Sequence, residues 1–363
     1  MVPRRDEEVT YRPRLRRGAR TTKRGPPNAL ALQRRVKGID TKDALRVKCT
    51  QHKHKRIARC KGRRLDFIYA VCPPGVLCQI FVGLSRTVIL FIVSSGLSLI
   101  LGVLRIPNVA HGSLYMIGAF MAFSISKAFG GGSMGFWVAL VCAPLGVALL
   151  SAVCERGIFQ YLYEREHLML LLLTFAFSLV FGDLVKLVWG GEYRSVPVPS
   201  VFQGFVPLFG GLPFPIYNLF LLLLGPVVAV ALWLLVNRTK MGKIARAAAV
   251  DREMVAAVGI NVSWVFASVF IIGCLLAGLG GVLVAPTVSV TLGMDNTLII
   301  EAFLIVIMGG LGNIWGALLG ALIFGLTQSL GILVWPQFGI IFPYAAVIVV
   351  LIFRPTGLLR STW

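Results

Sequence analysis

Charged side chains are scarce over most of this sequence. Of the 363 residues, 14% are charged and 57% are hydrophobic, whereas soluble domains carry about a quarter charged residues. The net charge of +21 is also unevenly distributed, because residues 1–66 hold 22 of the 36 lysines and arginines. Beyond residue 66 the composition excludes an ordinary soluble domain and indicates an integral membrane protein.

Paired cysteines are missing as well. The seven cysteines include no CxxC pair and are scattered over the whole chain. Those within apolar stretches are expected to act as small hydrophobic side chains. The sequence therefore predicts no disulfide framework, and it predicts no metal in the apolar part of the chain.

Enzyme signatures are absent too. The pair Gly242-Lys243 continues with Ile244 and lacks the first glycine of a phosphate-binding loop. Residues 131–135 match G-x-S-x-G by letter, but they lie in a turn between two apolar segments. That setting offers neither the strand–turn–helix context nor the paired histidine and acid of a hydrolase. We therefore expect no catalysis by this chain.

Residues 1–64 are basic and rich in proline and glycine, and they show no helical or strand periodicity. Such a segment cannot bury enough apolar surface to order itself, so we treat it as a disordered arm separate from residues 65–363. It could bind nucleic acid or anionic lipid, or hold metal through Cys49, His52, His54 and Cys60, although that spacing matches no standard zinc module. We favour a third interpretation, in which residues 1–64 correspond to upstream DNA and translation begins near Leu65.

Apolar segments of membrane-spanning length dominate residues 65–363 and predict an all-α polytopic fold with about eight or nine spanning or half-spanning helices. Two of them are short or interrupted by glycine and could be half helices. The expected segments are 80–104, 112–129, 136–154, 168–189, 215–236, 262–284, 298–311, 313–331 and 338–354.

The basic residues predict the orientation. Cytoplasmic loops carry the excess of lysine and arginine, which assigns 155–167, 237–263 and the C-terminal tail to the cytoplasm. Alternation then places 190–214 and 285–297 outside, and nine spans would place the N-terminus outside.

Residues 237–263, the polar island, separate two long apolar segments and contain five basic residues. Asp251 is a good N-cap, and Glu253 adds a negative charge to the first turn of a short helix. Gly259 is suited to end that helix in a left-handed conformation. A short capped helix between spans is suited to docking outside the membrane. Its expected apolar edge consists of Met254, Val255 and Val258.

Polar residues and glycine breaks within the apolar segments are the candidates for a transport pathway. Polar side chains are costly in the membrane, and helix breaks at membrane depth expose backbone. The candidates are Asn108, His111, Glu301, Gly309, Gly310 and Gly312. Small residues repeated every four positions predict close helix packing instead. These are Gly273, Ala277 and Gly281, and Gly312, Gly316 and Gly320.

One stretch, SLILGVLRIPNVAHGSLYMIGAF at residues 98–120, resembles the first signature of the branched-chain amino-acid ABC-transporter permeases. The polar island is similar to the cytoplasmic coupling loop of that family, with its Glu and Gly at Glu253 and Gly259, but with Met254 and Val255 where two alanines are usual. Segments 277–283, 308–317 and 353–358 are similar to later family segments. The resemblance covers about residues 80–360 and does not cover 1–64.

The resemblance implies an ABC importer permease in a bacterial inner membrane, embedded in lipid and working by alternating access. The implied partners are a second permease subunit, expected to form a heterodimer, two cytoplasmic ATPases, and a periplasmic substrate-binding protein. ATP would bind on the ATPases, with no cofactor in this chain. The ATPase-coupling residues would be Asp251, Arg252, Glu253, Met254, Val255 and Gly259.

Three alternatives stay open at the level of sequence. Relatives of this family are thought to carry urea or short amides in place of branched-chain amino acids. The chain could also be a carrier or channel that works without ATPases, which exchange of Glu253 or Gly259 would reveal. A membrane-tethered nucleic-acid binder rests entirely on residues 1–64, and we do not expect nucleic acid as a partner.

Overall fold

The computed structural model describes residues 74–162, 167–208 and 212–359. The chain divides into two units, Met1–Asp66 and Phe67–Trp363. The first unit, with the candidate metal ligands Cys49, His52, His54 and Cys60, lies outside the described residues. The description below concerns the second unit.

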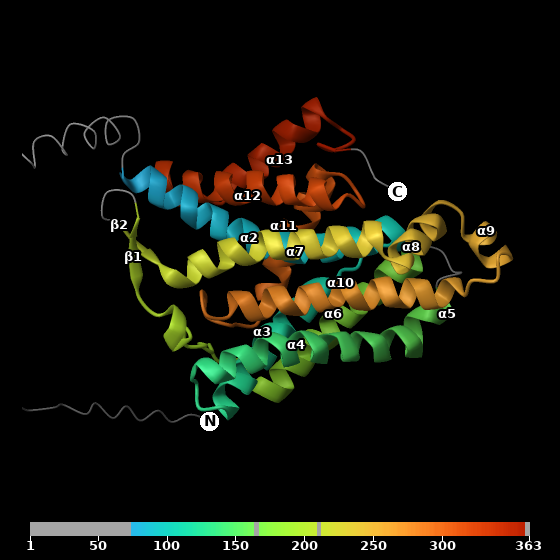
Figure 1. The fold of residues 1–363 in the computed structure, drawn as a ribbon, viewed down its shortest axis with the longest axis horizontal. Helices are drawn as coiled ribbons and strands as arrows, with labels where there is room; N and C mark the ends of the chain where they lie inside the picture. Colours follow the sequence, from blue (N-terminus) through green and yellow to red (C-terminus); the bar gives the residue numbers. More distant parts are fainter. Residues whose placement is uncertain (1–73, 163–166, 209–211, 360–363) are drawn as a thin grey trace, which may run out of the picture. The chain divides into compact units, whose positions relative to one another are not determined.

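Helices make up most of the described chain, as Figure 1 shows. The long ones are α2 (Pro74–Leu104), α3 (Ala110–Ala128), α4 (Ser133–Cys154), α6 (His167–Trp189), α7 (Ile216–Arg238), α8 (Lys240–Val250), α10 (Val262–Val284), α11 (Met294–Gly309), α12 (Ile314–Val334) and α13 (Ile341–Phe353). Short helical turns are η3 (Glu155–Phe159), α5 (Gln160–Leu162), η4 (Ser200–Phe202), α9 (Arg252–Ala257) and η5 (Pro336–Phe338).

Every apolar segment predicted to span the membrane contains a helix. Within the described residues, six helices are long and apolar enough to cross a membrane: α2, α4 with its extension to Leu162, α6, α7, α10 and α12. The segment expected at 298–311 is α11, whose 16 residues extend about 24 Å against a hydrocarbon thickness of about 30 Å. The segment expected at 112–129 is the continuous 19-residue α3 rather than a broken helix.

The two strands of the fold were not predicted. Within the 190–214 loop and the residue that follows it, β1 (Phe205–Leu208) and β2 (Leu212–Pro215) form an antiparallel hairpin in which Phe205 pairs with Pro215. The phenyl rings of Phe81 and Phe214 lie 5.6 Å apart, which fixes the hairpin against the start of α2. The fold is therefore mostly helical, with one small hairpin at an end of the bundle.

The core forms around α2 and α10. Most of the apolar surface of these two helices is buried by protein, whereas α6 and α7 expose most of theirs. Gly96 of α2 lies against Gly273 of α10, where an added Cβ would stand 2.6 Å from the Gly273 carbonyl oxygen. The absence of side chains at this crossing lets the two backbones approach closely.

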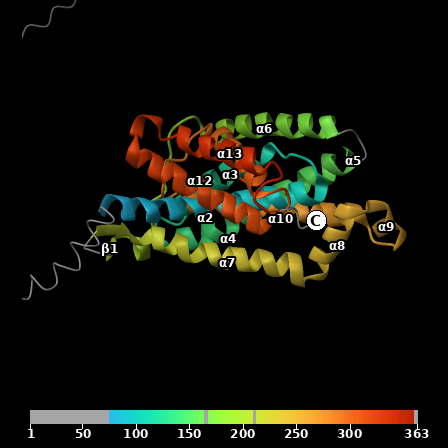
Figure 2. The ribbon, with the colours of Figure 1, turned by 90° about the horizontal axis from the view of Figure 1, so that it is seen from above.

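The bundle has two ends that differ in character, and Figures 1 and 2 show them. The hairpin end carries β1 and β2 together with the start of α2. The island end carries α8 and α9, and α5 lies at the same end. Segments 190–208 and 285–293 meet at the hairpin end, where Arg194 and Val290 form a β-bridge. The two loops predicted to lie outside thus meet at the end opposite the polar island.

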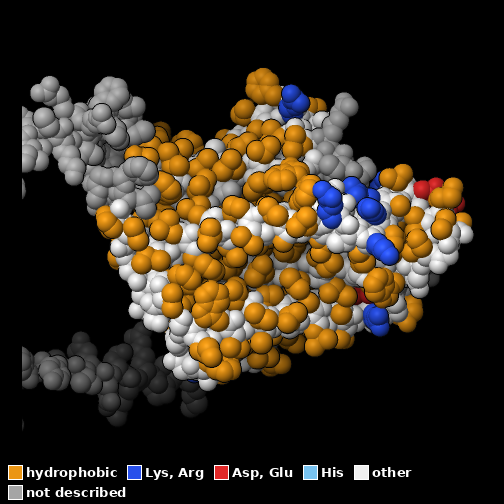
Figure 3. Space-filling view, viewed as in Figure 1, with side chains coloured by type: hydrophobic (Ala, Val, Ile, Leu, Met, Phe, Trp, Pro, Cys, Tyr) orange, Lys and Arg blue, Asp and Glu red, His pale blue; other side chains and the backbone are white. Residues whose placement is uncertain are grey.

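The surface repeats this division. Apolar side chains cover the flank seen in Figure 3, while lysines and arginines gather toward the island end. Arg238, Lys240 and Lys243 are exposed there, at the junction of α7 and α8. An apolar flank bounded by a cationic end is the surface expected of a membrane-embedded bundle.

Candidate functional site

The polar island contains two consecutive helices, of which only the second was predicted. Thr239 caps α8 by accepting a hydrogen bond from the Gly242 amide at 3.1 Å. Asp251 then caps α9, and its Oδ1 accepts from the Met254 amide at 3.0 Å. Alanines and Gly242 form the buried face of α8, and Lys240 and Lys243 lie on its exposed face, so the helix is amphipathic.

Gly259 ends α9 in the left-handed region, with φ of +86°. The Ile260 amide donates to the Val255 carbonyl at 3.3 Å, and the Gly259 amide donates to the Ala256 carbonyl at 2.9 Å. This pair of bonds is the Schellman motif, which satisfies the last helical carbonyls. Both ends of α9 are therefore fixed by local hydrogen bonds.

The exposed face of α9 differs from the predicted apolar edge. Met254 and Val258 are 62% and 72% exposed, but Val255 is buried, at 7%. Val255 therefore anchors α9 to the bundle and is not part of its free surface. The remaining free surface carries Met254, Val258 and the exposed Glu253.

Two arginines connect the polar island to the end of α2. Arg252 donates from Nη2 to the Leu104 carbonyl at 3.3 Å, and its guanidinium lies 4.7 Å from the centre of the Phe266 ring. In the opposite direction, Arg105 donates from Nη2 to the Ala249 carbonyl at 3.1 Å. Arg105 is the one described non-glycine residue with positive φ, at 59°. These contacts join α8 and α9 to the segment that leads from α2 into α3.

Asn108 lies within that segment and His111 in the first turn of α3, and both side chains are fully enclosed by protein. Asn108 is 1% exposed and His111 is 0% exposed. The Nε2 atom of His111 lies 3.0 Å from the Val93 carbonyl oxygen, and the Thr174 hydroxyl accepts from the Val109 amide at 3.3 Å. Among described residues, neither Nδ1 of His111 nor the side-chain amide of Asn108 has a hydrogen-bond partner.

Glu301 of α11 forms an ion pair that the sequence analysis missed. Nη2 of Arg86, near the middle of α2, donates to both carboxylate oxygens of Glu301 at 3.2 Å. The Glu301 side chain is 5% exposed, but the Arg86 side chain is 42% exposed. The only charged residue between Val76 and Leu104 is Arg86. A lone arginine in an apolar span was the signal that could have identified it.

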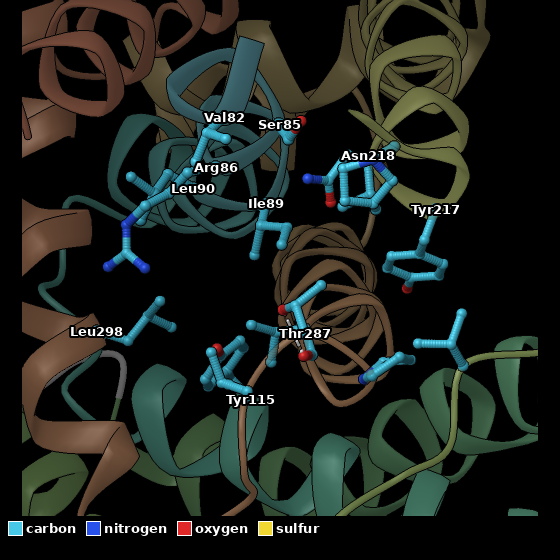
Figure 4. A pocket seen from close by; sticks show the side chains of 16 residues that line it. Val82, Ser85, Arg86, Ile89, Leu90, Tyr115, Tyr217, Asn218, Thr287 and Leu298 are labelled. Carbon is cyan, nitrogen blue, oxygen red and sulfur yellow. Dashed lines mark hydrogen bonds between the residues drawn. The ribbon is translucent and has the colours of Figure 1, made fainter. Parts of the chain in front are cut away.

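The exposed part of Arg86 lines a cavity of about 430 Å³, the hairpin-end cavity. Its walls come from α2, α3, α7 and α11, from the end of α10 and the segment that follows it, and from Val198 and Pro215. In Figure 4, Arg86 lies on one side and Asn218 and Tyr217 lie on the other, with Ile89 and Thr287 between them. Apolar residues dominate the lining, and Arg86 is its only charged member.

The glycine break between α11 and α12 is covered by the C-terminal segment. Gly310 and Gly312 have φ of 107° and 78°, which end α11 and turn the chain into α12. The Leu358 amide donates to the Met308 carbonyl at 2.8 Å, and the Leu359 amide donates to the Gly309 carbonyl at 3.1 Å. The freed backbone at this corner is therefore paired with protein.

The small residues at four-residue spacing lie at helix crossings. Gly273 faces Ile100 and Gly96 of α2, and Gly281 faces the α3 backbone at Tyr115. Ala277, between them, is fully buried. On the other repeat, Gly316 faces Gly309, and a Cβ on Gly320 would stand 2.7 Å from the Ile305 carbonyl oxygen. The first repeat thus holds α10 against two helices, and the second holds α12 against α11.

The structure distributes the predicted coupling and pathway residues over three places, with Glu301 at a fourth, on α11 against Arg86. The coupling candidates share the island end, Asn108 and His111 lie inside the bundle, and the glycine break faces the C-terminal segment. None of the pathway candidates lines the hairpin-end cavity, although Glu301 holds Arg86, which does. Within the described ranges, no group of three or more His, Cys, Asp or Glu side chains is placed to hold a metal ion.

Comparison with known proteins identifies the family. Residues 79–352 match the family model described as the permease component of branched-chain amino acid transport systems. The high-affinity branched-chain amino acid transport system permease protein LivH of Escherichia coli is 27% identical over 302 residues, covering 78% of this chain and 95% of that protein. BraD of Pseudomonas aeruginosa, with the same description, is 28% identical over 293 residues, with the same coverage.

Among solved structures, PsaBC from Streptococcus pneumoniae in complex with Fab aligns with a TM-score of 0.43 and 13% identity. That alignment covers 76% of this chain and 91% of the other. The family match spans most of the chain, and permeases of this family are multi-pass membrane proteins that are not themselves catalytic and need no cofactor of their own. The chain belongs to the branched-chain amino acid transport permease family and is the permease component of an ABC transport system.

Proposed function

We propose that this permease translocates branched-chain amino acids by alternating access, driven by ATPases that dock on the exposed face of α9. The substrate follows from the relatives named above, whose descriptions specify branched-chain amino acids. In this proposal residues 65–363 form the permease domain, and the polar island faces the cytoplasm, as its basic residues favour. Asp251 and Gly259 fix the two ends of α9, while Glu253 and Met254 contact the ATPase.

One observation supports this mechanism above the others: the reciprocal hydrogen bonds between the polar island and the end of α2. Because Arg252 binds Leu104 and Arg105 binds Ala249, a displacement of α8 and α9 pulls directly on residues 104–109. That segment contains Asn108 and leads into His111, and both residues are buried. Movement at the island end is therefore transmitted into the bundle at the point where the buried side chains of Asn108 and His111 lie.

The family implies ATPase and binding-protein partners. We propose that two ATPases bind at the island end and that the binding protein docks at the hairpin end of a heterodimer with a second permease. The hairpin and segments 190–208 and 285–293 give that end an irregular surface outside the spanning helices. Glu301 and the glycine break at Gly309, Gly310 and Gly312 then support the pathway from the side of α11 and α12.

The test uses the transporter assembled with its ATPases and binding protein. Met254→Asp and Val258→Asp place charge on the exposed apolar face of α9 and should abolish both ATPase co-purification and ATP-driven uptake of radiolabelled leucine. Met254→Leu and Val258→Ile are the controls, because they change the same two exposed side chains but keep the face apolar. Unchanged uptake in both α9 variants would favour a carrier or channel that works without ATPases. If urea competes with leucine uptake, the substrate class is urea or short amides instead.

A further inference from the structure

The hairpin-end cavity has the features of a small-molecule site. Its volume of about 430 Å³ lies within the range of roughly 300–1,000 Å³ found for ligand pockets. Such pockets combine mostly apolar walls with a few polar groups that fix the orientation of the ligand. Here the walls include Ile89, Leu90, Val284 and Leu298, and the one charge is Arg86.

Most other polar groups of the lining are already used inside the protein. The hydroxyl of Tyr217 donates to the Leu283 carbonyl at 2.7 Å, and that of Thr287 donates to the Val284 carbonyl at 2.7 Å. The Ser85 hydroxyl donates to the Phe81 carbonyl at 2.9 Å. These three hydroxyl groups already donate to backbone carbonyls, so Arg86 is the strongest hydrogen-bond donor available to a ligand.

Arg86 is bound on one side only. In the described chain its guanidinium donates from Nη2 to Glu301, whereas a guanidinium carries five N–H donors. Glu301 is buried, and the Arg86 side chain is 42% exposed, so the pair lies at the wall of the cavity and presents its cationic half to the interior. An arginine at this depth is costly unless it faces a partner or a water-filled space.

We propose that the hairpin-end cavity is a substrate site in which Arg86, oriented by Glu301, binds the carboxylate of an α-amino acid whose apolar side chain packs on Ile89, Leu90 and Leu298. Arginine is suited to this role because its planar donors match a carboxylate. The site lies at the end opposite the polar island. This inference rests on the proposed function, since it specifies how the same substrate is held within the permease.

A thiol in the cavity gives a readout independent of the binding protein and of ATP. Val288 lines the cavity and is 45% exposed, so Val288→Cys should react with a membrane-impermeant methanethiosulfonate in the purified transporter. Leucine at ten times its Kd should slow that reaction about tenfold, by the factor 1 + [L]/Kd. Leucinol, which lacks the carboxylate, should not protect, whereas 4-methylpentanoate, which keeps it, should.

Variants then separate recognition from structure. Arg86→Gln should weaken protection by leucine about ten- to a hundredfold, the effect of losing a charged hydrogen-bond donor. The exchange Arg86→Glu with Glu301→Arg restores an ion pair but places a carboxylate at the cavity, so it should recover stability without recovering protection. Arg194→Gln is the control, because Arg194 is a hairpin-end cation that lies outside this cavity.

Each outcome either supports the proposed site or overturns it. Equal protection by leucinol and leucine, or full protection in Arg86→Gln or in the exchanged pair, overturns the site. Leucine uptake by the wild-type transporter without any protection of the introduced thiol also overturns it and leaves the proposed function standing. Carboxylate-dependent protection that needs Arg86, in a transporter that takes up no leucine, supports the site and overturns the proposed substrate.

Discussion

Gly118 of α3 lies directly against Gly278 of α10, where a Cβ added to Gly118 would stand 2.6 Å from the Gly278 carbonyl oxygen. The obstacle is backbone rather than the end of a flexible side chain, so relief requires the two helices to separate. Because α10 also packs on α2 and α4, a shift at this crossing disturbs the centre of the bundle.

We expect Gly118→Ala to destabilise the protein by about 1–3 kcal/mol, the usual cost of overpacking a core. Gly182→Ala in α6 is the matched control, since nothing lies within 4 Å of its added Cβ. It should stabilise by up to about 1 kcal/mol through helix propensity. Thermal unfolding in detergent measures both, and equal midpoints for the two variants would contradict the assignment of this crossing.

The second prediction concerns transmission from the polar island. Arg252→Ala removes the hydrogen bond to Leu104 and the contact with Phe266, while the exposed face of α9 stays intact. We expect the ATPases to bind and hydrolyse ATP, but leucine uptake to fall several-fold. Arg252→Lys keeps the charge and should give an intermediate rate, because it lacks the planar donors. Uptake that tracks hydrolysis in Arg252→Ala would argue against this connection.

Gly259 offers a test of backbone conformation alone. Its φ is +86° and its added Cβ would meet nothing within 4 Å, so a substitution there is penalised by strain and not by collision. Gly259→Val should cost about 1–2 kcal/mol in local stability, and Gly259→Asn less, because asparagine tolerates the left-handed region. Hydrogen exchange of the α9 amides reports the difference. Similar exchange in the two variants would refute the argument.

The fourth prediction addresses the corner between α11 and α12. Leu358→Pro removes the amide that donates to the Met308 carbonyl at 2.8 Å, whereas Leu358→Ala keeps that amide and trims the side chain. Leaving a buried acceptor without its donor costs about 1–3 kcal/mol. We expect the proline variant to unfold at a lower temperature than the alanine variant. If alanine is as damaging as proline, side-chain packing holds the segment rather than the hydrogen bond.

Local signals in the sequence were sufficient for most of the fold. Long apolar segments predicted the spanning helices because a membrane demands such lengths. The boundaries of α9 were predictable because Asp251 and Gly259 act on backbone within a few residues of themselves. Contacts between residues far apart in the sequence could not be predicted. Arg86 and Glu301 are 215 positions apart, and no periodicity links them.

Two of the remaining differences also depend on distant parts of the chain. The face of Val255 depended on where α9 meets the bundle, which its own six residues do not specify. Helix α8 was missed although its small buried residues and exposed lysines alternate with the period of a helix. The covering of Gly309 and Gly310 depended on a segment that comes after two further helices.

That covering has a consequence for how the protein is made. The carbonyls of Met308 and Gly309 are exposed by the turn into α12, yet their donors, Leu358 and Leu359, emerge only after α12 and α13 have been synthesised. During insertion these two carbonyls therefore lack their hydrogen-bond donors while they lie in or near the bilayer, where water is scarce. These two hydrogen bonds therefore form late in biogenesis, after α12 and α13 have been synthesised and have packed.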